Sequence, residues 1–283
     1  MSVVPTILLF DNGSLEPAST RQLRRIAADL AARVGVPVAP VSLAHSAQIP
    51  AVQLDGCPAE LFEAALDRVL AAGAREVLAL PLFIGPSLAI VRWVPAMLAE
   101  RRSRYPQARL RVAPPLQTPG ERRLAEILAD HVRPHLAAGG RSRVAVVDHG
   151  SPAREVTAVR DDVTAQLHAL LGDGVAEVAA CSMERRAGPE YDFNEPLLAQ
   201  LLARPGWADG PLVVALLFLA PGRHAGPEGD VARIVRAARG ENGREIAFTR
   251  ALGEHPRLLE ILADRVHASF AERVPVAGEV RPQ

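Results

Sequence analysis

The sequence repeats once along its length, and this duplication limits the possible folds more than any other feature. Three segments recur in the same order at offsets of 134 to 137 residues: 124–132 with 258–266, 82–84 with 217–219, and 11–14 with 148–151. A single repeat of this length indicates a duplicated domain rather than a short-period solenoid. We therefore expect two similar domains, residues 1–136 and 143–283, joined by a short linker of mainly small residues.

Within each half, short apolar runs alternate with segments whose apolar residues follow a helical period. The predicted strands span 3–10, 38–43, 77–84 and 110–113 in the first half, and 144–147, 176–181, 212–219 and 246–248 in the second. The predicted helices span 20–34, 59–72, 91–102 and 122–133, and then 157–171, 195–203, 231–239 and 256–270. This alternation predicts an α/β fold in which each half forms a mostly parallel four-stranded sheet flanked by helices. We expect the two domains to face each other across a cleft.

Composition excludes several classes of protein. Hydrophobic residues make up 49% of the 283 residues, which is enough for two cores of ordinary size. Basic and acidic residues balance at 32 each and aromatic residues are only 4%, so we expect no nucleic-acid or membrane partner. The two cysteines, Cys57 and Cys181, predict neither a disulfide framework nor a zinc site. Because the N-terminus does not resemble a signal peptide and no apolar run is long enough to span a bilayer, we expect a cytoplasmic protein.

Polar residues follow three of the predicted strands in the second half. His149 follows the first strand, Glu184 the second and His224 the third. Ligand sites on open parallel sheets lie beyond the carboxyl ends of the strands, and neighbouring strands are ~5 Å apart, so these side chains are expected to converge. Two imidazoles and a carboxylate suit a borderline divalent metal such as Fe²⁺, Co²⁺, Ni²⁺ or Zn²⁺. The same imidazoles can accept protons near neutral pH.

The first half lacks both histidines. Asn12 stands at the position of His149 and Ala89 at that of His224, so we expect the chemistry in the second half. Ser151 is expected to cap the following helix, since no GxSxG context supports a nucleophilic role. The remaining histidines have no predicted convergent partner; they are His45, His131, His135, His168, His255 and His267. His131 and His135, spaced i, i+4 in the closing helix of the first half, are interpreted as a surface pair.

Two segments resemble a known family. Residues 148–151 behind a strand, and residues 217–224, are similar to the signature segments of the class II chelatases, the small sirohydrochlorin cobalto- and ferrochelatases of the CbiX/SirB type. Residues 113–116 and the repeated helix also resemble this family. The resemblance implies a lyase of cobalamin or sirohaem biosynthesis that inserts Co²⁺ or Fe²⁺ into sirohydrochlorin or a related tetrapyrrole without ATP or an organic cofactor. It implies that His149 and His224 bind the metal and accept protons, with Glu184 as the assisting carboxylate.

The same resemblance implies a substrate that carries many carboxylates. Arg185 and Arg223 lie beside the predicted ligands and can pair with carboxylates bidentately; with Ser151 they are the predicted substrate contacts. The first half is expected as the opposite wall of the cleft, and the loop 185–194 as a lid or a substrate contact. Two alternatives stay open, a metal-binding or metallochaperone-like protein without insertion activity and an inactive tetrapyrrole-binding partner. Ni²⁺ as the metal and the oligomeric state stay open as well.

Overall fold

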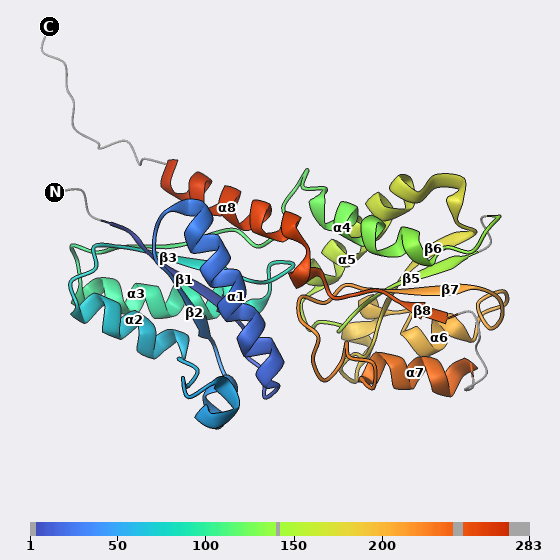
Figure 1. Ribbon diagram of the computed structural model, residues 1–283, viewed down its shortest axis with the longest axis horizontal. Helices are drawn as coiled ribbons and strands as arrows, with labels where there is room; N and C mark the ends of the chain where they lie inside the picture. The colour runs from blue at the N-terminus through green and yellow to red at the C-terminus, as the bar shows by residue number, and fades with distance from the viewer. Residues whose placement is uncertain (1–3, 140–141, 240–245, 272–283) are drawn as a thin grey trace, which may run out of the picture.

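A computed structural model describes residues 4–139, 142–239 and 246–271 of the chain. They form two α/β units that lie side by side (Figure 1), each built on a parallel four-stranded sheet. The first sheet has the order β2-β1-β3-β4 and the second β6-β5-β7-β8. The strands are β1 (Thr6–Asp11), β2 (Val38–Ser42), β3 (Glu76–Pro81), β4 (Arg109–Val112), β5 (Arg143–Asp148), β6 (Glu177–Ser182), β7 (Leu212–Leu216) and β8 (Ile246–Phe248). The predicted fold class is confirmed.

The helices follow the strands as the sequence pattern predicts. They are α1 (Pro17–Val34), α2 (Phe62–Ala71), α3 (Val94–Arg104), α4 (Arg123–Val132), α5 (Arg154–Leu171), α6 (Leu198–Leu202), α7 (Asp230–Arg239) and α8 (Pro256–Ala271). One predicted cap is wrong, because α5 begins at Arg154 with Ala153 at its N-cap. Ser151 instead accepts a hydrogen bond at Oγ from the Ala153 N–H, at 3.0 Å, in the turn that precedes the helix. Among the described residues, none of these helices is both long and apolar enough to cross a membrane.

The strands are apolar on both faces because helices cover both faces of each sheet. Side chains alternate along a strand, so Ile7 and Leu9 of β1 pack in the same core as the apolar face of α1. Leu8 and Phe10 point the other way and pack with apolar residues of α2 and α3. Pro40 lies in β2, which forms an edge of the first sheet, where its missing N–H costs no internal ladder bond.

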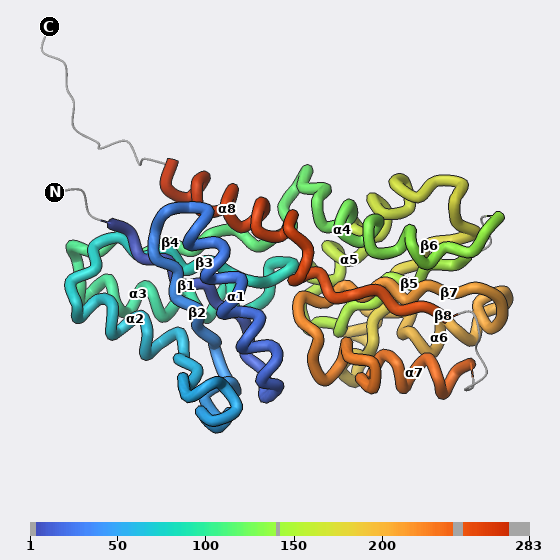
Figure 2. The backbone as a smooth tube through the Cα atoms, viewed as in Figure 1, coloured from blue at the N-terminus to red at the C-terminus, as the bar shows by residue number. Residues whose placement is uncertain are grey.

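The closing helices of the two halves are exchanged in space. α4 ends the first half of the sequence but packs against α5 and β7, whereas α8 ends the described chain and packs against α1 and β3. Figure 1 and Figure 2 show α4 within the unit of the second sheet and α8 along the unit of the first. The sequence pattern predicted both helices but not this exchange. Each copy of the repeated helix therefore completes the core of the other unit.

One core joins the two units as a result. The apolar faces of α4 and α8 are buried together with Ile7 and Leu9 of the first sheet and Val144 and Val146 of the second. Ion pairs connect the exchanged helices at their surface, from Arg123 to Asp264 at 2.6 Å and from Arg257 to Glu126 at 3.1 Å. The relative position of the two sheets is therefore set by core packing and not by the linker alone.

His131 lies inside this shared region, and its interpretation as part of a surface pair is wrong. Its side chain is on α4 and only 4% of the residue is exposed, with its ring 5.4 Å from that of His255 in an edge-to-face arrangement. Burial, and to a smaller extent the charges of Arg250 and His255, lower the pKa of His131 to about 4. His135 lies beyond the end of α4, in the turn of 3₁₀-helix that follows.

Candidate active site

The carboxyl ends of β5, β6 and β7 bring together the three side chains that the sequence singled out. The imidazole rings of His149 and His224 lie with their centroids 4.8 Å apart and their planes at 77°. Glu184 Oε1 lies 3.4 Å from His149 Nε2. All three side chains are partly exposed, so solvent and a ligand can reach them. Because the strands are adjacent and parallel, the loops that follow them meet at a single edge of the sheet.

Asp230, a residue that the sequence pattern did not single out, fixes the orientation of His224. Asp230 begins α7, and its Oδ2 lies 2.6 Å from His224 Nδ1. The Arg233 guanidinium also bonds this carboxylate, and Arg223 Nε lies 3.7 Å away. Burial acts to raise the pKa of Asp230, but the hydrogen bond to His224 and the arginine charges hold it below its ordinary value. An ionised acceptor at Nδ1 leaves His224 Nε2 with the free lone pair.

His149 is held by the tight turn behind it. Gly150 has φ +91°, and a Cβ at this position would lie 1.9 Å from the backbone oxygen of Glu184. Only glycine therefore permits the loops after β5 and β6 to approach this closely. The Glu184 N–H donates to the His149 carbonyl at 3.2 Å, and His149 Nδ1 lies 3.1 Å from the Gly150 carbonyl. These contacts place Nε2 as the ring nitrogen nearest Glu184.

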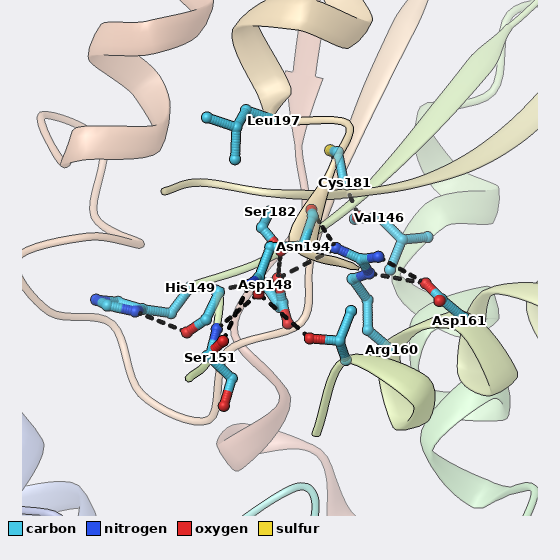
Figure 3. A network of polar contacts seen from close by, with 12 residues as sticks. Val146, Asp148, His149, Ser151, Arg160, Asp161, Cys181, Ser182, Asn194 and Leu197 are labelled. Carbon is cyan, nitrogen blue, oxygen red and sulfur yellow. Dashed lines mark hydrogen bonds and ion pairs between the residues drawn. The ribbon is translucent and has the colours of Figure 1, made fainter. Parts of the chain in front are cut away.

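A buried polar network lies beside the turn that carries His149 and supports it (Figure 3). Ser182 Oγ donates to Asp148 Oδ1 at 2.6 Å and accepts from Arg160 at 2.6 Å, while Arg160 also donates to the Asn194 carbonyl. Burial raises the pKa of Asp148 above its ordinary value, although Ser182 and Arg160 act against the rise. Figure 3 shows the His149 imidazole pointing away from this network. The network therefore positions the turn that carries His149, and the imidazole itself stays available.

The three predicted substrate contacts lie in different surroundings. Ser151 is tied into the network, since its N–H donates to Asn194 Oδ1 at 2.8 Å. Arg185 pairs with Asp192 and Glu195 at 3.0 and 2.9 Å and donates to two backbone carbonyls, so its guanidinium organises the loop that contains it. Arg223 is different, because 75% of its side chain is exposed and its ion pair with Asp230 is 3.7 Å long. Of the three, Arg223 alone lines the cavity beside the histidines.

A cavity of about 730 Å³ lies in front of the two imidazoles, between the two halves. The second half contributes His149, Phe218, Ala220, Gly222, Arg223, His224 and Ala225, and the first half contributes Asn12, Gly13, Ser14, Leu15, Glu16, Ser19 and His45. His45, for which the sequence predicted no partner, therefore lines the same cavity as the two site histidines. Sequence spacing gave no signal for this arrangement, because the loop after β2 reaches the cavity only through the packing of the two halves.

The first half keeps the framework of the site without its ligands. Gly13 has φ +87°, and a Cβ at this position would lie 1.7 Å from the backbone oxygen of Ala44. Gly150 has the same relation to the backbone oxygen of Glu184 in the second half. Asp11 is the counterpart of Asp148, and burial raises its pKa as well. Ser42 hydrogen-bonds Asp11 as Ser182 hydrogen-bonds Asp148. Within the described part of the chain, no three His, Cys, Asp or Glu side chains are already close enough to enclose a metal ion.

Comparisons with known proteins agree with this architecture. The structure of SirB from Bacillus subtilis with Fe³⁺ has a TM-score of 0.70 at 18% identity, covering 94% of this chain and 96% of that one. SirB of the subspecies spizizenii in complex with cobalt gives 0.69 at 17%, with 94% of each chain covered. CbiX, the terminal enzyme for biosynthesis of siroheme in denitrifying bacteria, gives 0.58 at 19%, covering 93% and 98%. No curated protein matches the sequence. The CbiX family model matches residues 6–134 and again 143–269, so the chain belongs to the CbiX family, with one copy in each half.

Proposed function

We propose that this protein is a chelatase that inserts Co²⁺ or Fe²⁺ into sirohydrochlorin or a related tetrapyrrole without ATP. The observation that carries the proposal is the pair of imidazoles 4.8 Å apart, facing a cavity between the halves of a CbiX-family chain. Similar structures are described as a sirohydrochlorin chelatase and as complexes with iron and cobalt. The metal is a substrate in this reaction and leaves with the product.

His149 and His224 are the proposed metal ligands, with Glu184 as the third. Glu184 lies 3.4 Å from His149 Nε2 on an exposed side chain, so a small rotation brings a carboxylate oxygen to an ion held by the rings. Three protein ligands leave coordination positions open, as catalytic metal sites require and closed four-ligand sites do not allow. Open positions let the macrocycle nitrogens bind before the imidazoles release the ion.

Insertion also requires proton acceptors. Two N–H bonds of the macrocycle break as the metal–nitrogen bonds form, and no electrons are transferred. Once the ion has left the imidazoles, His149 has a free Nε2 that can take up a proton, and the nearby Glu184 carboxylate stabilises the resulting cation. Arg223, exposed at the cavity wall, is the proposed partner of a substrate carboxylate.

The test is an anaerobic insertion assay with sirohydrochlorin and Co²⁺, Fe²⁺ or Ni²⁺ in turn, followed by the absorption bands of the macrocycle. Wild type is expected to accelerate the band change above the protein-free rate. His149→Ala removes most of the acceleration, while His168→Ala, an exposed histidine near the end of α5, is the matched control. Co²⁺ binding without acceleration would favour the metallochaperone-like alternative. A band shift on macrocycle binding alone, without metal insertion, would favour an inactive tetrapyrrole-binding partner.

A further inference from the structure

His45 is a histidine on the first-half side of the site cavity, opposite the half that carries the proposed ligands. It lines the same cavity as His149 and His224. It follows Ala44, whose carbonyl lies against Gly13 as that of Glu184 lies against Gly150. The first half therefore has alanine where the second has the proposed assisting carboxylate, and carries an imidazole one residue further along.

The backbone at His45 adopts a conformation that residues other than glycine rarely adopt. Its φ is 62° and its ψ −49°, and the Ser46 N–H donates to the Ala44 carbonyl at 2.7 Å. These values define a γ-turn of the positive-φ kind, which is rare and strained. Apart from Asp55, it is the one non-glycine residue with positive φ in the described chain. Strain of this kind is retained in proteins mainly where it serves a functional site.

The surrounding contacts hold the turn in place. The N–H groups of Leu43 and Ala44 donate to the carbonyls of Asp11 and Asn12 at 3.0 and 3.1 Å. Ser46, which is 1% exposed, donates at Oγ to Ser42 Oγ at 3.0 Å and accepts from the Ser14 N–H at 3.2 Å. His45 itself is exposed. The turn therefore presents an imidazole from a rigid base to the cavity.

From this geometry we infer that His45 is a catalytic proton acceptor of the insertion reaction, acting on the macrocycle from the wall opposite the metal. The inference rests on the proposed function. A flat macrocycle between the two walls receives the metal on the face that His149 and His224 approach. The charge of the entering ion repels the remaining N–H protons toward the other face, where His45 lies. One N–H bond breaks, its proton passes to a ring nitrogen of His45, and its electron pair stays on the macrocycle nitrogen and binds the metal.

The second macrocycle proton passes to His149 on the side of the metal ligands, or to water. His45 returns its own proton to solvent after the product leaves.

The other polar side chains on the first-half wall of the cavity do not supply an equivalent proton acceptor. Asn12 and Ser14 do not accept protons near neutral pH, and Glu16 is a carboxylate, which is a weaker base than imidazole. The His45 imidazole has no hydrogen bond or ion pair within the described residues that would have to break first.

The experiment uses His45→Gly, because glycine accepts the positive φ and keeps the turn without the imidazole. We expect insertion to slow by roughly tenfold or more, equivalent to about 1.4 kcal/mol. The Kd for Co²⁺ alone, measured from the absorption of the bound ion, should stay within roughly twofold of wild type. Added imidazole should restore part of the lost rate in His45→Gly, because the missing ring leaves room for a free base in the cavity.

His135→Ala, an exposed histidine outside the cavity, is the matched control, and imidazole is also added to wild type to correct for its binding of free Co²⁺. A His45→Gly rate within roughly twofold of wild type, or no rescue by imidazole, would overturn the inference. A parallel loss of Co²⁺ affinity would make His45 a metal ligand and would overturn it too. If wild type itself inserts no metal, it is the proposed chelatase function that fails.

Discussion

Replacing Asp230 with asparagine tests how the site prepares His224 to bind metal. The carboxylate accepts the Nδ1 proton of His224 at 2.6 Å, which leaves Nε2 free to bind an ion. Asparagine has the same shape, but its amide can donate to Nδ1 and so favours the tautomer with the proton on Nε2. The substitution also removes the negative charge between Arg223 and Arg233, so that uncompensated positive charge lies beside the proposed metal position.

The expected loss is large enough to measure. Partners that orient a metal-binding histidine typically change metal affinity by about 10- to 100-fold, or roughly 1.4–2.7 kcal/mol. Because 24% of the Asp230 side chain is exposed, water can replace part of the lost interaction, and we expect a change near the lower end. The insertion rate at low metal concentration should fall by the same factor, since both quantities depend on the same ligand.

The assay is a Co²⁺ titration of Asp230→Asn followed by its absorption, alongside Asp192→Asn as the control. Asp192 pairs with Arg185 in the loop after β6, so its loss removes a surface carboxylate without touching His224. The reasoning is refuted if the Kd of Asp230→Asn is within roughly twofold of wild type, or if both variants lose affinity equally.

Further predictions concern the ligands, the buried histidine and the exchanged helix. His149→Ala or His224→Ala should slow insertion by ~100-fold or more, about 2.7 kcal/mol, whereas Asn12→His should change the rate little. Burial lowers the pKa of folded His131 to about 4, so its contribution to stability is complete above pH 6.5 and is lost as the pH falls toward 4. Between pH 6.5 and pH 4, the free energy of unfolding in urea should therefore fall by about 3 kcal/mol less for His131→Leu than for wild type. An equal dependence of unfolding free energy on pH in the two proteins would contradict the buried, neutral state of His131. Deleting residues 256–283 removes α8 and should unfold the first unit, because α8 packs against α1 and β3. A native far-UV circular dichroism spectrum for the truncated chain would argue against the shared core.

Much of the fold follows from the pattern of apolar residues. β3 overlaps the predicted strand 77–84, and β2, which contains Pro40, overlaps the predicted strand 38–43. The exchange of α4 and α8 was not predictable in the same way. The two helices have nearly the same sequence, so either sheet offers each of them an equivalent apolar face. The sequence therefore specifies that a helix with this apolar pattern covers each sheet. Whether that helix is α4 or α8 depends on how the two units are connected.

The candidate site was predictable as far as strand ends determine it. His149, Glu184 and His224 follow adjacent strands, and their approach is a direct result of parallel pairing. Asp230 was missed because an acidic residue at the start of a helix is common for reasons of helix stability and does not stand out. His45 was missed because its approach depends on how the two halves pack, which the local sequence does not encode.

The exchange of α4 and α8 also determines when the protein can fold during its synthesis. The first sheet is complete once β4 has left the ribosome, yet α8, which covers one face of it, ends roughly 160 residues after β4. At roughly 5–20 residues per second, the nascent first unit therefore waits about 8–32 s with part of its apolar face uncovered. The second unit finds α4 already synthesised when its own strands emerge. Newly made chains should therefore depend on chaperones through their N-terminal half, although that half lacks the proposed metal ligands.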